Sequence, residues 1–538
     1  MHVRGKWTTG PRVVVWLVFA VMALTACSSA PSTVSGTGQP IKGGTLTIAL
    51  GADPKFVNPD LSTDAGTQQI GSMIYEGLVW INAATNAPEP LLAKSWTISP
   101  DGLTYTFMLE DVAWSDGQPF TSADVKYTLL QIGKISPPFA KAWNSIQSID
   151  DSDPHTAVIT LKQPFGPFLQ SLSQHGAAIL PAHIFQGTSP LTNPASLDKP
   201  VGTGPFLLRE WMRGDHLTLV KNPKYWRSGQ PLLDEIVAKI LPSGSGAILA
   251  LEAGSVDFVQ SLIFDASFYP QITKNPKLTL HPGTFAPTDD YIFFNVKRAP
   301  YNDPAVRQAL FMALDRTYLT KNVWAGYGQS GVGPFDNRLT WAYNPQIDYN
   351  VMYPYDVAKA KSMLDAAGYK VGANGTRFNM DLVVDAASGW DTLAPALKSM
   401  WGTVGVNVKI DEVSGLVGDN RVFIQHDFDA APYDYTTNGD PVLGIARVYT
   451  TASIGTSYGN ASGYSNPEVD QLFAKGQVAS TQAERATYYR QVQAILAKDL
   501  PVLTIHQDDE QDAVSKRVHD LWAAQNDGEW GEAWVSPA

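Results

Sequence analysis

With 538 residues the chain is too long for a single hydrophobic core, so the sequence predicts two or three domains. Apolar residues make up 44% and charged residues 17%, a globular composition that excludes a disordered chain and a coiled coil. The net charge of −12, without any basic run in the body, argues against nucleic acid as a partner.

The first 26 residues have the pattern of a signal peptide. A basic start precedes the apolar run 13–26, which is too short for the roughly 20 apolar residues that span a bilayer. The run ends in Leu24-Thr25-Ala26-Cys27, which resembles the bacterial lipobox, in which a signal peptidase cuts before a cysteine that is then acylated. The alternative is a lone buried thiol behind a plain secretion signal. We therefore expect lipidation at Cys27.

Residues 27–42 are expected to form a flexible tether, because 28–40 are rich in Ser, Gly and Pro. Cys27 is the only cysteine, so an internal disulfide or a thiolate metal cluster is excluded. Together these segments predict a body that is lipid-anchored on the extracytoplasmic face of the cell membrane.

The body beyond residue 43 alternates between strand and helix patterns. Period-two alternation predicts strands at 45–50, 105–109, 158–161 and 218–220. The last of these is predicted to close a hairpin around the turn 213–215. Capping residues predict helix starts at Asp303, Asp356, Asn466 and Thr481. Because the two kinds of segment interleave, the fold class is mixed α/β.

No catalytic constellation is visible. The stretch 455–459 matches G-x-S-x-G, but turn residues follow Ser457, whereas a nucleophile elbow needs a strand before the serine and a helix after it. The nine histidines are scattered, and no phosphate-binding or dinucleotide-binding glycine loop is present. The sequence therefore predicts a binding protein rather than an enzyme, with no cofactor and no metal.

Several blocks, in order along the chain, carry a family resemblance. They are LAKSW at 92–96, SPDGLTYTF at 99–107, WSDGQPFTSADV at 114–125, VGTGPF at 201–206, NPKYW at 222–226, FNV at 294–296 with PYNDPAVRQAL at 300–310, and SGYSNPEVD at 462–470. In this order they resemble the family 5 extracellular solute-binding proteins, which are the oligopeptide-binding and dipeptide-binding lipoproteins of ABC importers.

The resemblance implies a periplasmic-binding-protein-like α/β fold of class II (cluster C), with two lobes and an extra N-terminal subdomain. Lobe 1 is then expected from 43–85, 190–285 and 505–538, the extra subdomain from 86–189, and lobe 2 from 286–504. Such a protein works by hinge closure around a solute, without bond chemistry. The implied partners are a peptide or other small solute and the permease subunits of an ABC transporter, and the protein is expected to be a monomer.

The ligand site is expected around the segment 433–440, where this chain departs from the peptide binders. Asp440-Pro441 matches the family's D-P step, but the ammonium-binding position falls on Thr437, and the stretch 383–387 lacks the arginine of dipeptide binders. The predicted ligand-binding residues are Asp434, Asp440 and Arg338 for charged groups, Tyr433, Tyr435 and Trp390 for stacking, and Thr437 and Asn438 within the segment.

Three functions stay open on this sequence. The leading one is capture of oligopeptides for an importer. The same transport role for a non-peptide ligand, namely haem, a nickel chelate or an oligosaccharide, explains the missing terminus-binding residues equally well, since a buried and unpaired terminal charge is costly. A sensor or surface hydrolase on the same fold is the third, and turnover of a model substrate would distinguish it.

Overall fold

The computed structural model describes residues 39–82, 87–134, 140–283, 287–386, 390, 392–521 and 530–537. The predicted signal peptide, Cys27 and most of the predicted tether lie outside the described residues. Residues Gly38–Ala538 form one compact unit, which is the body of the protein. Within the described part of the chain, no helix is both long and apolar enough to cross a membrane.

The first large sheet has seven strands in the order β12-β19-β11-β1-β10-β9-β8. Their bounds are β1 (Thr45–Leu50), β8 (Phe206–Met212), β9 (His216–Lys221), β10 (Glu235–Ile240), β11 (Phe258–Val259), β12 (Leu278–Pro282) and β19 (Gln511–Ser515). The predicted strand at 45–50 is β1, which runs parallel to β10 and β11. The predicted hairpin is β8–β9, and Gly214 at its turn has a φ of +75°.

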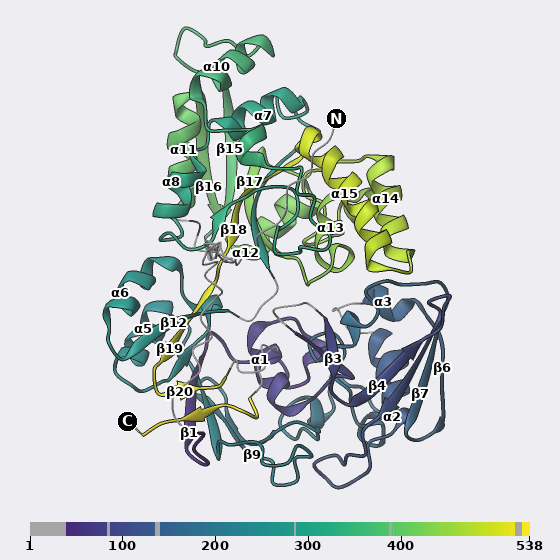
Figure 1. Ribbon diagram of the computed structural model, residues 1–538. Helices are drawn as coiled ribbons and strands as arrows, with labels where there is room; N and C mark the ends of the chain where they lie inside the picture. The colour runs from purple at the N-terminus through teal and green to yellow at the C-terminus, as the bar shows by residue number, and fades with distance from the viewer. Residues whose placement is uncertain are drawn as a thin grey trace, which may run out of the picture. The chain divides into compact units, whose positions relative to one another are not determined.

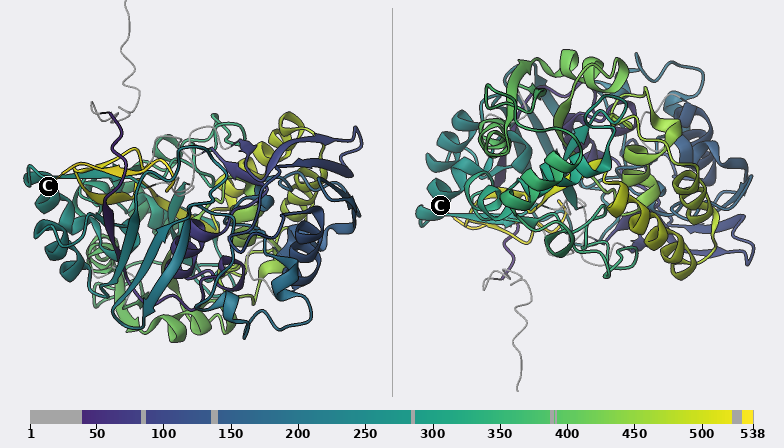
Figure 2. Two further views of the ribbon diagram at one scale, coloured as in Figure 1. Left: turned by 90° about the horizontal axis from the view of Figure 1, so that it is seen from below. Right: turned by 90° about the horizontal axis from the view of Figure 1, so that it is seen from above.

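Helices α1 (Ala65–Ile74), α5 (Gly244–Glu252) and α6 (Tyr269–Lys274) accompany this sheet. Its core includes Leu46, Ile48 and Phe206, which are all fully buried. The two ends of the body meet here, because a Cβ on Gly44 would lie 2.9 Å from Val535. Strand β21 (Trp534–Val535) and β1 are the yellow and purple segments near the C-terminal label in Figure 2.

The second large sheet has six strands in the order β14-β18-β13-β17-β15-β16. Their bounds are β13 (Thr288–Phe294), β14 (Gln329–Ser330), β15 (Phe378–Asp385), β16 (Val406–Val413), β17 (Ala430–Thr436) and β18 (Val502–Asp508). Strand β15 is parallel to β16 and β17, whereas β13 is antiparallel to β17 and β18. The sheet is therefore mixed, with its parallel part at one side.

The helices of this region include α7 (Pro304–Met312), α8 (Arg316–Asn322), α10 (Val357–Ala366), α11 (Leu393–Thr403), α14 (Pro467–Val478) and α15 (Gln482–Asp499). Four of them, α7, α10, α14 and α15, begin where the sequence predicts, whereas α8 and α11 were not predicted from capping residues. The side chains of Asp303, Asp356, Asn466 and Thr481 each accept a backbone N–H at the first turn of the helix that follows them. These local bonds satisfy donors that the helix itself leaves unpaired, which is why the starts could be predicted.

A third, four-stranded sheet, in the order β4-β5-β7-β6, falls within the range expected for the extra subdomain. Its strands are β4 (Ala93–Ile98), β5 (Thr104–Leu109), β6 (Ile146–Asp153) and β7 (Thr156–Leu161), and α2 (Ser122–Gln131) begins after the capping residue Thr121. It has its own core, which includes Phe107, Trp114 and Phe168. The predicted strands at 105–109 and 158–161 are β5 and β7.

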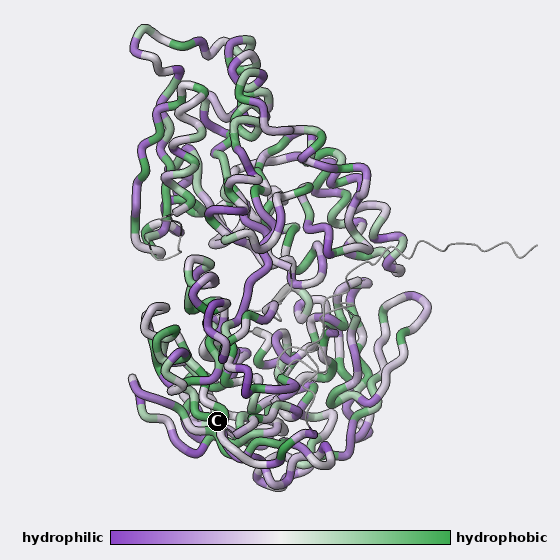
Figure 3. The backbone as a smooth tube through the Cα atoms, turned by 60° about the vertical axis from the view of Figure 1, so that its left-hand side comes forward, coloured by the Kyte–Doolittle hydropathy of each residue, from purple (hydrophilic) through white to green (hydrophobic). Residues whose placement is uncertain are grey.

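The chain crosses between the two large sheets twice. One crossover joins β12 to β13 through 283–287, and the other joins β18 to β19 through Asp509–Glu510. Because β18 continues to Asp508, the second crossover lies four residues beyond the boundary at 504–505 that the sequence indicates. Figure 3 shows hydrophilic chain where the two parts of the body connect.

The glycines at 202 and 204 allow backbone to pack on backbone. A Cβ on Gly202 would lie 1.9 Å from the carbonyl oxygen of Ile74, the last residue of α1. The N–H of Gly204 donates to that oxygen at 2.9 Å, and the carbonyl of Gly202 accepts from Ser115 of the four-stranded sheet's region at 3.0 Å. The loop therefore ties the region of the four-stranded sheet to α1 beside the first large sheet, and glycines at these positions allow the backbone to come this close.

Candidate functional site

The parallel strands of the second large sheet end close to a crossover. Strands β15, β16 and β17 end at Asp385, Val413 and Thr436, and Thr436 pairs with Thr288, the first residue of β13 after the crossover. In open α/β sheets, ligands bind outside the carboxyl ends of the strands. This edge is therefore the candidate site (Figure 1).

Three titratable side chains form a row across neighbouring strands. Asp434 on β17 pairs with Asp290 on β13, which in turn pairs with His506 on β18. Nδ1 of His506 lies 3.3 Å from Oδ2 of Asp290, and its Nε2 lies 3.0 Å from the carbonyl oxygen of Tyr327. The ring of Trp324 stacks on the imidazole, with 4.0 Å between centroids. Asp290 and His506 are buried, while Asp434 at the end of the row is exposed.

The surroundings of this row disfavour charge. Burial raises the pKa of Asp434, although its side chain is accessible to solvent, and Arg447 acts against that rise. Burial, with Asp290 as the next cause, raises the pKa of Asp508 to about 7. Burial lowers the pKa of His506 to about 4, so the imidazole is neutral at neutral pH. The carboxyl groups therefore stand in an enclosed environment, where a cationic ligand group would be favoured.

The crossover residue Glu510 is affected by the same group of acidic side chains. Burial raises its pKa to about 8, and the next causes are the neighbouring charges of Asp508 and Asp434. Its Oε2 accepts a hydrogen bond from Ser261 at 3.1 Å, and Ser261 follows β11 of the first large sheet. Acidic groups of the second large sheet therefore lie near the crossover acid Glu510, which is hydrogen-bonded to the first-sheet side through Ser261.

Arg338, predicted to bind a ligand's charged group, clamps the crossovers. It is ion-paired with buried Asp336 at 2.5 Å. Its Nη1 donates to the carbonyl of Asp508 at 2.6 Å, and its Nη2 donates to that of Thr288 at 3.3 Å. These partners belong to β18 and β13, so the guanidinium holds the ends of two strands that lead into the crossovers.

Asp440 is turned into the protein. It is fully buried, caps the π-helical turn η8 (Pro441–Ile445) by accepting from the N–H of Val442, and pairs with Arg485 of α15. Two nitrogens of Arg485 lie 2.7 and 2.8 Å from its carboxylate oxygens. Burial acts to lower the pKa of Arg485, but the charge of Asp440 outweighs it and the pKa is raised. Both charges are therefore compensated internally.

The predicted aromatic residues are mostly packed inside the region of the second large sheet. The hydroxyl of Tyr433 donates to Asp419 at 3.3 Å, and Asp419 ends α12 (Gly415–Asp419). The hydroxyl of Tyr435 donates to the carbonyl of Gly459 at 3.3 Å. Trp390 is 8% exposed and belongs to a core cluster with Leu393. On β17 the two tyrosines therefore share the buried face, and Asp434 points the other way.

Thr437 and Asn438 form a turn next to the first crossover. Thr437 is buried, and its N–H donates to the carbonyl of Pro287 at 2.8 Å. Asn438 is half-buried with a φ of +48°, and its side chain donates to the carbonyl of Leu443 at 3.4 Å. The turn thus links β17 to the crossover and to η8.

Sequence reasoning missed several residues at this edge. Asp290, His506, Asp508 and Glu510 reach it only through strand pairing, and the acidic run 508–510 was the one visible signal. It also missed Leu416 and Val417 of α12, which directly follow β16 and whose exposed fractions are 87% and 54%. The edge therefore combines carboxylates with accessible apolar surface.

The catalytic alternatives gain no support from the geometry. Residues 455–459 lie in turns rather than between a strand and a helix, so Ser457 is not on a nucleophile elbow. Among the described residues, no three His, Cys, Asp or Glu side chains are placed to hold a metal ion.

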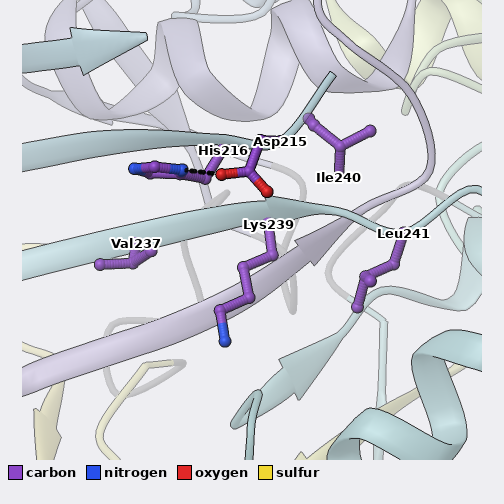
Figure 4. A pocket seen from close by; sticks show the side chains of 6 residues that line it. All are labelled: Asp215, His216, Val237, Lys239, Ile240 and Leu241. Atoms are coloured by element: carbon purple, nitrogen blue, oxygen red, sulfur yellow. Dashed lines mark hydrogen bonds and ion pairs between the residues drawn. The ribbon is translucent and has the colours of Figure 1, made fainter. Parts of the chain in front are cut away.

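A shallow surface pocket of about 240 Å³ lies on the first large sheet, away from the row described above. Figure 4 shows its lining, in which Asp215 and His216 interact, their Oδ2 and Nδ1 atoms being 2.7 Å apart. The remaining lining residues come from β10 and its end: Val237, Lys239, Ile240 and Leu241. It shares no residue with the candidate site.

Comparison with known proteins gives a consistent result. The sequence model of the bacterial extracellular solute-binding proteins, family 5 (middle region), matches residues 87–455. The probable D,D-dipeptide-binding periplasmic protein DdpA of Escherichia coli K12 is 28% identical over 480 residues, covering 88% of this chain and 90% of that protein. Heme-binding protein A of Haemophilus influenzae is 28% identical over 522 residues, covering 91% and 92%.

Solved structures agree on the fold. The oligopeptide-binding protein AppA of Bacillus subtilis, in complex with a nonapeptide, superposes with a TM-score of 0.77 at 24% identity, covering 93% of this chain and all of that one. NikA of Brucella suis, in complex with Fe(III)-EDTA, gives 0.81 at 22% identity, covering 92% and 100%. These likenesses confirm the predicted two-lobe α/β fold.

Proposed function

Because the chain belongs to the bacterial extracellular solute-binding proteins of family 5, we propose that it captures oligopeptides outside the membrane and delivers them to an ABC-type permease. DdpA of Escherichia coli and AppA of Bacillus subtilis, similar over about nine-tenths of this chain, are named for dipeptide and oligopeptide binding. The role requires no bond chemistry, since binding and release of the solute suffice.

The mechanism we propose is hinge closure between two lobes, and we assign the first large sheet to lobe 1 and the second to lobe 2. Lobes 1 and 2 are joined by the two crossovers, at 283–287 and at Asp509–Glu510, so a rotation there changes their separation while each sheet stays intact. A solute that contacts both lobes shifts the population towards the closed form, which the permease recognises.

Asp434 is the proposed anchor of the ligand, and its exposure is the observation that carries this assignment. Its carboxylate is accessible at the candidate edge, whereas that of Asp440 is already paired with Arg485. In addition to burial, the charge of Asp434 raises the pKa of two neighbouring acids, Asp290 and Glu510. A peptide ammonium group would neutralise Asp434 in these acidic surroundings. Main-chain pairing with strand edges would supply much of the remaining affinity.

The other predicted residues are proposed to shape the site around this anchor. Arg338 and Asp440 hold the strand ends and the turn in place through their internal pairs. The remaining members of the set, which border the same strand and turn, are Trp390, Tyr433, Tyr435, Thr437 and Asn438.

A non-peptide ligand is the second candidate. Thr437 stands at the family's ammonium-binding position, and the stretch 383–387 has no basic residue for a carboxylate terminus. Haem, a nickel chelate or an oligosaccharide would need neither residue. Among the relatives, heme-binding protein A of Haemophilus influenzae is named for such a ligand, and the solved NikZ of Campylobacter jejuni contains Ni(L-His).

We further propose that the mature protein is a monomer, anchored by lipid on Cys27 to the extracytoplasmic face of the cell membrane. A sole cysteine directly behind an apolar signal core supports the anchor. The Ser/Gly/Pro-rich stretch that follows would let the body reach solutes and the permease.

The test uses residues 28–538 and thermal unfolding. A ligand that binds only the folded protein raises the midpoint, by about 2.7 kcal/mol of stabilisation at a hundredfold excess over its Kd. We expect random tetrapeptide pools to stabilise the protein, and Asp434→Asn to remove this effect while the exposed control Glu412→Gln retains it. Stabilisation by haem, nickel chelates or oligosaccharides, with no response to any peptide pool, would replace the peptide ligand and leave the transport role.

A further inference from the structure

The extra subdomain contacts lobe 2 at a point that leaves no room for a side chain. The N–H of Gly166, which follows β7, donates to the carbonyl of Gln477 in the last turn of α14 at 2.8 Å. A Cβ on Gly166 would lie 2.5 Å from Nε and 2.7 Å from Cζ of Arg485. The glycine therefore packs directly against the guanidinium group of Arg485, a residue of α15.

Arg485 is held rigidly on the lobe 2 side of this contact. Its Nε donates to the carbonyl of Gly476 at 2.8 Å, and its Nη2 donates to the hydroxyl of Tyr489 at 2.9 Å. The ion pair with Asp440 occupies the remaining edge, and Arg485 is 5% exposed. Because these partners engage all three nitrogens of the planar guanidinium through four contacts, the group cannot easily move aside.

Apolar contacts accompany the polar ones. Val442 and Leu443 of η8 pack against the core of the extra subdomain. This turn begins directly after Asp440, so the proposed ligand segment 433–440 leads into the surface that meets the subdomain. Asp440 thus connects the ligand segment, the turn η8 and Arg485.

Backbone contacts tie the subdomain to lobe 1, and we therefore assign it to the body that moves with lobe 1. Ser115 bonds to the loop at Gly202, which packs on α1 of lobe 1. A hinge rotation at the crossovers would therefore separate Gly166 from Gln477 and expose Val442 and Leu443.

From these contacts we propose that Gly166, Gln477 and the Asp440–Arg485 pair form a closure latch, which is made only when the subdomain and lobe 2 come together. In this arrangement Asp440 is a positioning residue: it holds Arg485 and η8 so that ordering of the segment 433–440 favours the latch. The inference rests on the proposed hinge mechanism, but it does not depend on which ligand is bound.

The latch can be tested by measuring one distance. Gln163 and Lys475, both exposed, line a shared surface pocket of about 310 Å³ between the subdomain and α14. In Cys27→Ser protein, which lacks other cysteines, Gln163→Cys and Lys475→Cys accept two nitroxide labels. Electron–electron double resonance then reports the short distance of the closed form and the longer distance of the open form.

The decisive variant is Gly166→Ala, with Gly402→Ala as its matched control. Gly402 has no atom within 4 Å of an added Cβ, and neither glycine has a positive φ, so the control adds the same methyl group to open space. We expect Gly166→Ala to lower the ratio of closed to open protein by about three- to tenfold, as a clash made only in the closed form requires. Gly402→Ala should leave the ratio unchanged.

Leu443→Ala serves as a second variant should Gly166→Ala unfold the protein, and it should shift the ratio in the same direction. A single distance that neither substitution changes would overturn the latch. The contact would then either be permanent or contribute nothing to the equilibrium between the closed and open forms. Tetrapeptide pools should raise the closed fraction of the parent protein. If the pools do nothing while Gly166→Ala still shifts the ratio, the peptide proposal fails and the latch stands.

Discussion

Asp434 and Asp290 lie directly opposite each other on the antiparallel strands β17 and β13. Like charges in such a position destabilise a sheet, and burial together with the charge of Asp434 raises the pKa of Asp290 well above its ordinary range. His506 offers no relief, because its own pKa is lowered to about 4 by burial. The pair is therefore stabilised either by protons or by a cation that arrives from outside.

The first prediction concerns the pH dependence of stability. Burial raises the pKa of Asp508 to about 7 and that of Glu510 to about 8, so the folded protein binds protons that the unfolded chain releases near pH 4. Stability from these groups is complete below the unfolded pKa and is lost as the pH rises through 7 to 8. His506 acts in the opposite sense, but only between about pH 4 and 6.5. We expect the thermal midpoint of the ligand-free protein to fall from pH 6.5 to pH 8.

Asp508→Asn should flatten this decline, since the amide does not titrate. Asp101→Asn is the control, because Asp101 is an exposed carboxylate whose pKa is lowered, first by its hydrogen bond with Ser99. A midpoint that rises between pH 6.5 and pH 8 would contradict the assignment of raised pKa values to the crossover acids.

The second prediction compares two neighbours on α7. The buried guanidinium of Arg307 donates to the backbone carbonyls of Leu500 and Tyr301, at 2.8 and 2.6 Å, and to that of Asp499. Arg307→Met would leave these carbonyls without their donors in the interior, at a cost of about 3 kcal/mol or more. Gln308→Met removes one exposed bond, to Lys498, and should cost less than about 1 kcal/mol. Urea unfolding measures the free energy of unfolding of both variants. Equal losses of stability would contradict the prediction that the buried hydrogen bonds of Arg307 contribute more than the exposed bond of Gln308.

The third prediction concerns the backbone contact at Gly202. A Cβ there would stand 1.9 Å from the carbonyl oxygen of Ile74, so Gly202→Ala must displace α1 or the loop, and we expect a loss of about 3 kcal/mol. Gly246→Ala is the control, because its Cβ would meet Ser243 at an ordinary 3.6 Å. Differential scanning calorimetry of the two variants separates them. A Gly202→Ala protein as stable as its parent would show that the contact can relax.

The fourth prediction concerns the anchor. Cys27→Ser should release the protein from the membrane fraction of the producing cells, because acylation needs the cysteine thiol. Ser28→Ala, its neighbour in the predicted tether, should leave the protein membrane-bound. Fractionation with metabolic labelling by an alkyne fatty acid measures both. A labelled, membrane-bound Cys27→Ser protein would place the anchor elsewhere.

The sequence predicted the elements whose cause is local. Asp303 and Thr481 start their helices through side-chain bonds that reach only two or three residues along the chain. The blocks that carry the family resemblance likewise consist largely of turns, caps and close backbone approaches. For this reason they identify the fold and say little about the ligand.

The candidate site was predicted only in part, because its contacts join distant residues. The D-P step suggested Asp440 as a ligand residue, but the partner that neutralises it, Arg485, lies 45 residues further along. The opposition of Asp434 and Asp290 likewise depends on the pairing of β17 with β13, which no local pattern specifies. The alternation within 433–435 did contain usable information, since period two already separates Asp434 from its two tyrosine neighbours.

The position of β19 has a consequence for the order in which the protein is built. This strand lies between β12 and β11 inside the first large sheet, yet it comes from the last thirty residues of the chain. During synthesis and export from the N-terminus, β11 and β12 are delivered well before β19, the strand that pairs with both of them. Lobe 2 is complete once β18 has emerged and so can fold earlier. A truncation that removes β19 should therefore spare lobe 2 and leave lobe 1 open, exposing the edges of β11 and β12 to aggregation.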